Sequence, residues 1–479
     1  MLSFAPWRRD LRVSTFPRSS SCAGRAVRTS FLRSCWMRLE QFDGKRIAIL
    51  GWGREGQCAA ATLSQRLPDA KLSVLVERGP RPAHWPGWTG SFDERLEQFD
   101  ILLRSPGVPV DHPALVAASR TGVSIVNPAS IWFSQRPDVP VIGVTGSKGK
   151  STTASLLAHL LQASGYRVLL AGNIGEPLLG HLDLNADYVV LELSSYQLTD
   201  LDAVLTMGLF TRLFDEHLDW HGSRAAYFAS KLRIADLLAG RPLLVNAADP
   251  LLLDCTRRIE GLVQANRWPE FHRRGDSLWL DDHLCLDLAE LNLTGRHNLD
   301  NAALALAAAR RLGGRTETLL EALRSFRPLA HRLEPLARQA GLDWVNDSIS
   351  TSPHATRAAL ESLADRPITL IVGGQNRPAD WQPVLEWCRS RPLAALVALP
   401  DTGRVVAEVL REGGCVANNR ICQVDNLGEA VAAAATLSAE NGVVLLSPGA
   451  PSFPRFQDFE ARGDAFRQAV ADYSDRSTA

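Results

Sequence analysis

A strand, a glycine-rich loop and a helix are predicted one after another in residues 140–165, "PVIGVTGSKGKSTTASLLAHLLQASG". Five residues separate Gly143 from Gly149, one more than the strict phosphate-loop pattern has before its Gly-Lys-Ser. The physical requirements are still met, because loop N–H groups and a helix N-terminus can bind an anion. Lys150 would neutralise phosphate charge, and Ser151 could ligate Mg²⁺. A purely structural glycine turn is the alternative, but the lysine and serine in register favour a phosphate loop.

A second strand, glycine turn and helix are predicted near the start of the chain, in Lys45–Leu63. The turn contains Gly51, Gly53 and Gly56 in the spacing of dinucleotide-binding loops. Glu77 lies about 20 residues further on, where a ribose-binding acid would lie. Taken alone, this motif is compatible with NAD, with another nucleotide, or with close packing of a strand against a helix.

Short apolar strands alternate with helical stretches again in the last third of the chain. One strand runs into the polar loop of residues 343–356, "DWVNDSISTSPHAT", which leads into a helix. Loops at the ends of parallel strands often hold ligands. The 479 residues are too many for one ordinary core. We therefore expect an α/β protein of about three domains with parallel sheets.

The composition is that of a globular protein without a strongly charged partner. The hydrophobic fraction is 46%, the charged fraction is 22% and the formal net charge is zero. These values give no reason to expect nucleic acid as the partner, and no apolar run approaches the roughly 18 residues of a membrane span. The eight cysteines are scattered, without a Cys-x-x-Cys pair, which favours reduced thiols in a cytosolic protein.

Residues 1–36 differ from the rest, with seven Arg, seven Ser and Asp10 as the one acidic residue. Such a segment is typical of a transit peptide. It is also compatible with an upstream extension of the reading frame in which Met37 is the true start. We favour the extension, and in either case expect this segment to be poorly ordered.

Three side chains in the central region carry chemistry. Glu192 lies inside an apolar strand, where a carboxylate needs a cation, hydrogen bonds or a metal. A buried ion pair and a metal site are equally compatible with it. His217 lies among acids in "TRLFDEHLDWHG" and is a candidate metal ligand, although a lone histidine is more often structural. Lys231 follows Tyr227 by one helical turn, and a solvated helical lysine is the alternative.

These segments together resemble the Mur ligases, the ATP-dependent amide-bond enzymes of peptidoglycan precursor synthesis. The similarity runs from about Met37 to the end of the chain and keeps the order of the family's motifs. The matching segments are "GVTGSKGKST", "GNIG", "ELSSYQL", "DEHLDWHG", "SKLRI", "GRHNLDNAALA", "AHRLE", "NDSISTSPHAT" and "LLSPGAPSFPRFQDFEARGDAF".

The resemblance implies a domain order. It leaves residues 1–36 outside the fold. It makes residues 37–136 a Rossmann-like UDP-substrate domain, residues 137–326 a P-loop-type mononucleotide-binding ATPase domain, and residues 327–479 a Rossmann-like domain for glutamate and ATP. The N-terminal glycine turn then becomes a uridine-diphosphate site rather than an NAD site.

The resemblance also implies roles for single residues. ATP would contact Gly146, Gly149, Lys150, Ser151, Thr152, Asn298, Asn301, Arg332 and Asp347. The UDP substrate would contact Gly53, Arg54, Glu77, Arg78, Ser105, Asn173 and Gln197. Glutamate would contact Ile349, Thr351, Arg377, Ser452 and Phe459. The catalytic set would be Lys150, Glu192, His217 and Lys231. Ser151 and Glu192 would hold one Mg²⁺ ion. His217 would hold a second Mg²⁺ ion, bridged by Lys231 in carbamylated form.

The implied cofactors are ATP and two Mg²⁺ ions, and the implied substrates are UDP-N-acetylmuramoyl-L-alanine and glutamate. The L-alanyl carboxylate would attack the γ-phosphate of ATP, and the glutamate amine would then displace phosphate from the acyl phosphate. The resemblance implies a cytoplasmic, monomeric enzyme of cell-wall synthesis, hence of cell shape and division, with no nucleic-acid partner and no membrane insertion.

The chain departs from the family pattern at two places. The phosphate loop has Ser147 and Lys148 where the family usually has Thr-Asn, and we expect Lys148 to add positive charge near the phosphates. The polar loop has Ile349 where enzymes that add D-glutamate typically have a lysine. Without a cation at this position, a dianionic amino acid should bind in a different orientation. A branch of the family adds L-glutamate, and "NDSISTSPHA" resembles that branch, so we expect L-glutamate over D-glutamate.

Other classes of protein explain less of the chain. A nicotinamide-dependent dehydrogenase would explain the N-terminal glycine turn but not Lys150, Glu192, His217 and Lys231. A transport or signalling ATPase would explain the phosphate loop but not the C-terminal motifs. A folate polyglutamylating ligase would share the ATP machinery but not the N-terminal turn. A non-catalytic binding module would leave the whole catalytic set without a purpose.

Overall fold

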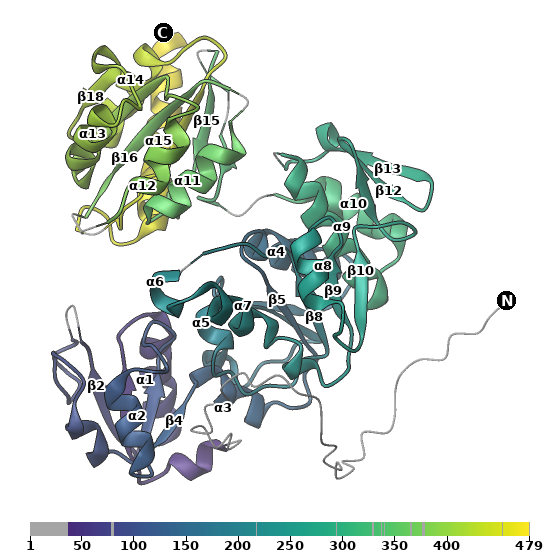
Figure 1. The fold of residues 1–479 in the computed structure, drawn as a ribbon, viewed down its shortest axis with the longest axis vertical. Helices are drawn as coiled ribbons and strands as arrows, with labels where there is room; N and C mark the ends of the chain where they lie inside the picture. Colours follow the sequence, from purple (N-terminus) through teal and green to yellow (C-terminus); the bar gives the residue numbers. More distant parts are fainter. Residues whose placement is uncertain are drawn as a thin grey trace.

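The computed structural model describes residues 37–77, 81–216, 218–293, 295–327, 330–336, 338–339, 341–364, 366–375, 379–452 and 454–478. Four predicted features lie outside these residues: the segment 1–36, Arg78, His217 and Arg377. The described chain forms three units in sequence order, each built around one mainly parallel sheet (Figure 1). None of the helices in these ranges is long and apolar enough to cross a membrane.

The N-terminal unit has a four-stranded parallel sheet in the order β2-β1-β3-β4. Its strands are β1 (Arg46–Leu50), β2 (Lys71–Leu75), β3 (Ile101–Arg104) and β4 (Ser124–Val126). Its helices are α1 (Arg54–Arg66), α2 (Pro113–Arg120) and α3 (Pro128–Gln135), with short 3-10 turns η1 (Leu39–Phe42) and η2 (Glu94–Gln98). A Cβ atom on Gly56 would lie 2.2 Å from the carbonyl oxygen of Gly51. Helix α1 therefore packs so closely against the turn after β1 that only glycine fits at position 56.

The central unit has a six-stranded parallel sheet in the order β10-β9-β8-β5-β7-β6. Its strands are β5 (Val141–Thr145), β6 (Val168–Gly172), β7 (Tyr188–Glu192), β8 (Met207–Phe210), β9 (Leu243–Asn246) and β10 (Leu262–Ala265). Its helices are α4 (Lys150–Ala163), α5 (Ser195–Leu198), α6 (Leu218–His221), α7 (Arg224–Leu232), α8 (Pro250–Thr256), α9 (Arg296–Arg311) and α10 (Thr316–Ser325), with η3 (Leu178–His181), η4 (Asp236–Leu238) and η5 (Leu288–Glu290). The alanine- and leucine-rich helices α4 and α9 pack side by side and bury most of the apolar core on one face of the sheet.

An antiparallel three-stranded sheet is attached to the central unit and was not expected from the sequence. It consists of β11 (His272–Arg274), β12 (Ser277–Leu280) and β13 (His283–Asp287). Its strands are short and only partly buried. A strand of three to five residues without a buried alternation carries little sequence signal.

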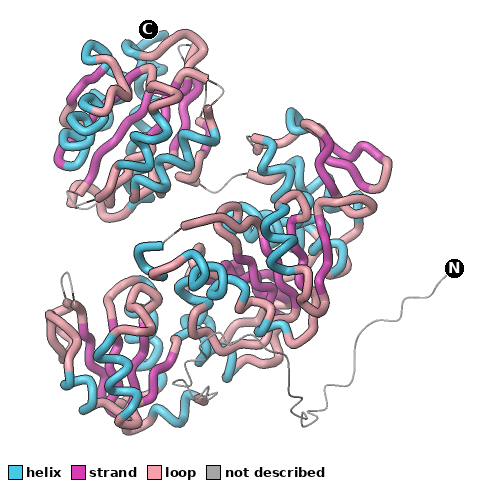
Figure 2. The backbone as a smooth tube through the Cα atoms, viewed as in Figure 1, coloured by secondary structure: helices cyan, strands magenta, loops and turns pink. Residues whose placement is uncertain are grey.

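The C-terminal unit has a six-stranded sheet in the order β14-β15-β19-β16-β17-β18, parallel except for β14. Its strands are β14 (Glu334–Pro335), β15 (Asp343–Asn346), β16 (Ile368–Gly374), β17 (Ala395–Asp401), β18 (Ile421–Gln423) and β19 (Val443–Leu446). Its helices are α11 (Pro353–Ser362), α12 (Gln382–Cys388), α13 (Thr402–Glu412), α14 (Leu427–Leu437) and α15 (Phe459–Thr478), with η6 (Asn418–Arg420). Figure 2 shows helices on both faces of this sheet.

The predicted α/β class with parallel sheets and several domains is confirmed. The domain boundaries after residues 136 and 326 stay predictions.

Candidate functional site

The phosphate loop connects β5 to α4 at the carboxyl edge of the central sheet. Gly149 is the residue before α4 and has φ +87°, a left-handed conformation that glycine adopts without strain. A Cβ atom there would lie 2.4 Å from Oδ1 of the Asn301 side chain. That amide in turn donates to Oδ1 of Asn298 at 3.0 Å, so both asparagines on α9 that are predicted to contact ATP lie together at the loop. Nζ of Lys150 folds back and donates to the Ser147 carbonyl at 2.9 Å.

Ser147 and Lys148 join the loop to the segment that follows β8. The Ser147 hydroxyl donates to the Phe214 carbonyl at 2.8 Å and lies 2.9 Å from the Tyr227 hydroxyl. Lys148 forms an ion pair with Glu216 at 2.6 Å. The extra cation expected near the phosphates is therefore already paired with a carboxylate in this structure.

Glu192 ends β7 and is fully buried. Its Oε1 accepts a hydrogen bond of 3.0 Å from the side-chain amide of Asn173. Its Oε2 has no hydrogen-bond partner among the described residues. An unpartnered carboxylate oxygen in the interior is costly, and a cation would offset that cost. The donor set therefore fits a hard oxygen-binding cation such as Mg²⁺. In the described part of the chain, which does not include His217, no group of three or more His, Cys, Asp or Glu side chains could hold a metal.

Lys231 on α7 is almost completely buried, which excludes the alternative of a solvated helical lysine. Its Nζ donates to the Gly146 carbonyl at 2.7 Å, directly on the phosphate loop. Burial lowers the pKa of Lys231 well below the usual lysine value, and the nearby charge of Lys150 adds to this shift. Burial also lowers the pKa of Lys150, while Glu192 and Glu216 oppose that change. Both lysines and Glu192 are thus gathered around one loop.

The predicted UDP-substrate residues lie at the carboxyl edge of the N-terminal sheet and beside it on the central unit. Gly53 caps α1 and Arg54 begins it, both exposed. Ser105 follows β3, and its hydroxyl lies 3.5 Å from the Gly51 carbonyl. Glu77 follows β2 and accepts hydrogen bonds from the Phe92 N–H and from His112.

Two predicted substrate contacts on the central unit have protein partners in this structure. The Asn173 amide binds Glu192, as described above. The Gln197 amide on α5 donates to Oε1 of Glu55 on α1 at 2.7 Å. Gln197 therefore links the central unit to the helix that begins at the N-terminal glycine turn.

Asp347 lies in the polar loop after β15 and is buried. Its oxygens accept hydrogen bonds from the Leu333 N–H at 3.1 Å and from the hydroxyls of Ser350 at 2.5 Å and Ser447 at 2.9 Å. Burial raises the pKa of Asp347 to about 6, and these hydrogen bonds partly oppose the rise.

Arg332 lies in the segment between α10 of the central unit and β14 of the C-terminal unit. Its positive charge acts on the pKa of both Lys150 and Asp347, so it is near both predicted ATP-binding groups. Its Nε is buried without a hydrogen-bond partner among the described residues. Both neighbours of Arg332 have left-handed backbones, with φ +62° at His331 and +42° at Leu333.

The predicted glutamate residues surround the same polar loop. Ile349 is half-buried, and its N–H donates to the His331 carbonyl at 3.0 Å. Thr351 is exposed, whereas Ser452 is buried. The Phe459 carbonyl accepts a hydrogen bond of 2.7 Å from the Ser348 hydroxyl. The roles of these residues toward glutamate stay predictions.

Arg462 supports this loop and was missed by the sequence reasoning. It is buried, and its guanidinium donates to the Ser348 carbonyl at 2.8 Å, the Ser348 hydroxyl at 3.0 Å and the Ala450 carbonyl at 2.9 Å. Burial lowers its pKa to about 10, so it stays charged at neutral pH. The available signal was an arginine between apolar helical positions in "FEARGDAF", which is usually read as an exposed charge.

Two family models match the chain. The Mur ligase middle domain matches residues 144–309, and the Mur ligase, glutamate ligase domain matches residues 331–450. The chain is 39% identical over 453 residues to UDP-N-acetylmuramoyl-L-alanine--L-glutamate ligase of Xanthomonas euvesicatoria pv. vesicatoria, covering 90% of this chain and 96% of that protein. It is 38% identical to the protein of the same name from a Micromonospora species, covering 91% and 98%.

Solved structures show the same fold at lower identity. MurF ligase from Thermotoga maritima in complex with ADP aligns with a TM-score of 0.56 and 17% identity, covering 92% of this chain and 97% of that one. The identity to named ligases over 90% of the chain, the two family models and the phosphate loop all indicate the same family. The chain therefore belongs to the Mur ligase family and is an ATP-dependent, amide-bond-forming ligase.

Proposed function

We propose that this ligase joins glutamate to UDP-N-acetylmuramoyl-L-alanine in peptidoglycan precursor synthesis, and that it takes L-glutamate in preference to D-glutamate. The names of the relatives support both parts of this proposal. The apolar Ile349 in the polar loop supports the choice of enantiomer. Enzymes that add D-glutamate typically have a lysine at this position, and a site without it must bind the two carboxylates of glutamate through other groups. We further propose that the enzyme works as a cytoplasmic monomer.

The observation that carries the proposal is the group of charges on the phosphate loop. Lys150 and Lys231 both donate to loop carbonyls, and the buried Glu192 keeps one oxygen without a partner among the described residues. Such a group binds a nucleoside triphosphate with a hard cation.

In the proposed reaction, the L-alanyl carboxylate attacks the γ-phosphorus of ATP, and ADP leaves. The Lys150 ammonium offsets the negative charge that accumulates on the transferring phosphoryl group. The glutamate amine then attacks the carbonyl carbon of the acyl phosphate, loses a proton, and inorganic phosphate leaves. Ser151, Glu192, His217 and a carbamylated Lys231 would hold two Mg²⁺ ions, which when bound supply further positive charge for phosphoryl transfer.

Water must be excluded from the acyl phosphate, or it hydrolyses. Arg332, which lies near Lys150 and near Asp347, is the group that would bring the C-terminal unit and the terminal phosphates together. Asp347 would accept hydrogen bonds from the ATP ribose. Closure of the C-terminal unit over ATP would then complete the site.

The test is a ligation assay with UDP-N-acetylmuramoyl-L-alanine, ATP and each glutamate enantiomer, followed by mass spectrometry of the product and phosphate release. We expect product with L-glutamate at a kcat/KM at least tenfold higher than with D-glutamate. Lys150→Ala should abolish phosphate release. A higher kcat/KM with D-glutamate would overturn the choice of enantiomer, and no product with either would overturn the reaction itself.

A further inference from the structure

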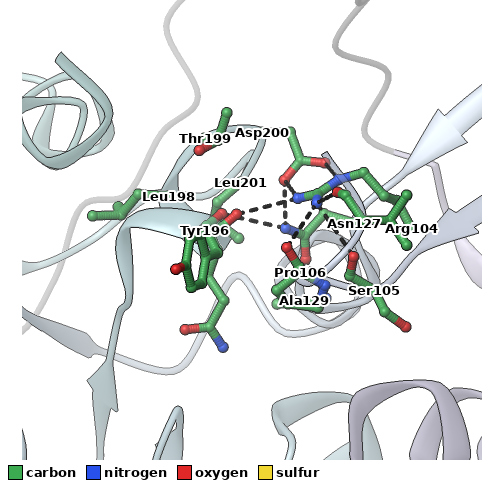
Figure 3. Close-up of polar contacts among 12 residues, drawn as sticks. Arg104, Ser105, Pro106, Asn127, Ala129, Tyr196, Leu198, Thr199, Asp200 and Leu201 are labelled. Atoms are coloured by element: carbon green, nitrogen blue, oxygen red, sulfur yellow. Dashed lines mark hydrogen bonds and ion pairs between the residues drawn. The ribbon is translucent and has the colours of Figure 1, made fainter. Parts of the chain in front are cut away.

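Arg104 joins the N-terminal sheet to the central unit. It is the last residue of β3 and is fully buried. Its Nε donates to Oδ2 of Asp200 at 2.6 Å, and one terminal nitrogen donates to Oδ1 of the same carboxylate at 2.5 Å and to the Tyr196 carbonyl at 3.2 Å. Figure 3 shows this arrangement, with the guanidinium facing the Asp200 carboxylate. Asp200 follows α5 of the central unit, so the ion pair joins the end of β3 in the N-terminal unit to the turn after α5 in the central unit.

The other terminal nitrogen of Arg104 binds its own loop. It donates to the carbonyls of Ser105 and Pro106, both at 3.2 Å (Figure 3). It also donates to the carbonyl of Val108. The guanidinium thus holds the turn after β3 and the turn after α5 at the same time. Arg presents its five N–H groups in a rigid plane, so it fixes directions as well as distances.

A second side chain strengthens the junction. Asn127 donates from its amide to Oδ1 of Asp200 at 2.9 Å, and its Oδ1 accepts from the Ala129 N–H at 3.0 Å at the start of α3. The Asp200 side chain is only 5% exposed. A buried carboxylate with three charged or polar donors is fixed in one orientation, because any rotation would leave a buried donor without a partner.

Both turns that Arg104 holds carry predicted substrate contacts. Ser105 is next to Arg104 and is one of the residues predicted to contact the UDP substrate. Gln197 is three residues before Asp200 and is another of the residues predicted to contact the UDP substrate. The proposed substrate extends across the junction, because its diphosphate binds at the N-terminal glycine turn while its L-alanyl carboxylate must reach ATP on the central unit. The distance between the two turns therefore decides whether the carboxylate arrives at the γ-phosphate.

We propose that Arg104 and Asp200 form a positioning pair that sets the spacing and orientation of the two halves of the site for a nucleoside-diphosphate sugar that carries a carboxylate. This inference rests on the proposed function. The proposal assigns neither residue a contact with substrate. The pair acts through the turns after β3 and α5.

Steady-state kinetics on the full-length enzyme test the pair. In Arg104→Met and Asp200→Asn, we expect the KM for UDP-N-acetylmuramoyl-L-alanine to rise at least tenfold, with the KM for ATP within twofold of the wild type. Arg104→Lys should not restore the KM, because an ammonium cannot span both turns. The double variant Arg104→Met/Asp200→Met removes both charges, so its melting temperature should return toward the wild-type value while the KM for the UDP substrate stays raised.

The matched control is the ion pair between Arg46 and Asp100, which lies at the opposite end of the N-terminal sheet. It is also an Arg–Asp pair with two side-chain hydrogen bonds, but both side chains are solvent-exposed. Arg46→Gln should leave both KM values unchanged. A folded double variant with a wild-type KM for the UDP substrate, or an equal rise in both KM values, would overturn the inference. A wild-type enzyme that does not use this substrate at all would instead refute the proposed function.

Discussion

The side-chain amide of Asn173 donates a hydrogen bond of 3.0 Å to Oε1 of Glu192, and Oε2 of the same carboxylate has no partner among the described residues. Glu192→Gln removes the charge but keeps the shape. We expect the Mg²⁺ concentration for half-maximal activity to rise at least tenfold and kcat to fall about a hundredfold. A Mg²⁺ titration of phosphate release measures this. Glu176→Gln, at an exposed carboxylate paired with His181, is the control and should change neither value. An unchanged Mg²⁺ requirement in Glu192→Gln would argue against a metal at this oxygen.

Lys231 should form a carbamate with carbon dioxide. Only the neutral amine reacts with carbon dioxide, and a lowered pKa increases the neutral fraction at a given pH. We expect ¹³C-bicarbonate to give a carbamate carbonyl signal in the NMR spectrum of the wild-type enzyme and not of Lys231→Arg. Activity should fall severalfold in buffer depleted of carbon dioxide and return on adding bicarbonate. The absence of both the signal and the bicarbonate effect would contradict the prediction.

The KM for ATP should depend on pH through Asp347. Its pKa is raised to about 6, so below that pH the carboxylate is protonated and accepts the ribose hydroxyls poorly. At pH 5 about a tenth of it is ionised, so we expect the KM for ATP to be about tenfold higher than at pH 8. In Asp347→Asn the KM should be high at both values. A pH profile of the wild type that persists in this variant would assign the titration to another group.

The raised pKa of Asp347 also makes the free energy of unfolding depend on pH. Between about pH 4 and pH 6 the folded protein binds more protons at Asp347 than the unfolded chain does. The contribution of this group to the free energy of unfolding therefore falls as the pH rises through that window. Urea midpoints of wild type and Asp347→Asn should diverge over this interval and run parallel above it.

Arg462→Met should loosen the polar loop that contains Ile349. The guanidinium donates hydrogen bonds to the carbonyls of Ser348 and Ala450. Its loss leaves these buried carbonyls without donors, which costs about 1–3 kcal/mol of stability for each group. We expect faster hydrogen exchange in peptides that cover the polar loop of residues 343–356 and the turn after β19, together with a higher KM for glutamate. Arg411→Met removes an exposed arginine paired with Glu408 and should have no effect on either. Unchanged exchange in Arg462→Met would show that the loop does not need this support.

Ile349→Lys should shift the enzyme toward D-glutamate. The backbone at this position is held by the hydrogen bond to His331, so we expect the lysine side chain to replace the sec-butyl group of isoleucine without moving the loop. We expect the ratio of kcat/KM for L-glutamate to that for D-glutamate to fall about tenfold, or about 1.4 kcal/mol. Ile349→Leu should keep the wild-type ratio. A ratio that does not change in Ile349→Lys would remove this position from the specificity determinants.

Much of the fold could be predicted from local pattern. The strands β1, β5, β7, β15, β16, β17 and β19 are apolar and bounded by glycine or polar residues, which is the pattern of strands buried in parallel sheets. The helix after the phosphate loop begins at Lys150, as the glycine pattern predicts. The antiparallel strands β11 to β13 were missed because short, half-exposed strands have no strong period.

The residues of the candidate site also fall into two groups, those that the sequence predicts and those that it does not. Residues within one motif, such as Gly149, Lys150 and Ser151, are recognisable because their spacing is fixed by one turn of chain. Partners that the fold brings from far away, such as Arg104 and Asp200, leave no pattern in the sequence, because neither residue has a distinctive local context. The same holds for the ion pair between Lys148 and Glu216, while the expected role of Lys148 near the phosphates stays a prediction.

The ion pair between Arg104 and Asp200 also limits how the molecule can deform. Sliding the N-terminal sheet past the central sheet would separate two buried charges, at about 3–5 kcal/mol when one is left unpaired. Thermal energy is about 0.6 kcal/mol, so such sliding is rare. We therefore expect the first two units to move as one body, so that the enzyme has one joint instead of two. Closure becomes a search over the orientations of the C-terminal unit alone, which lowers the conformational entropy lost each time the site assembles.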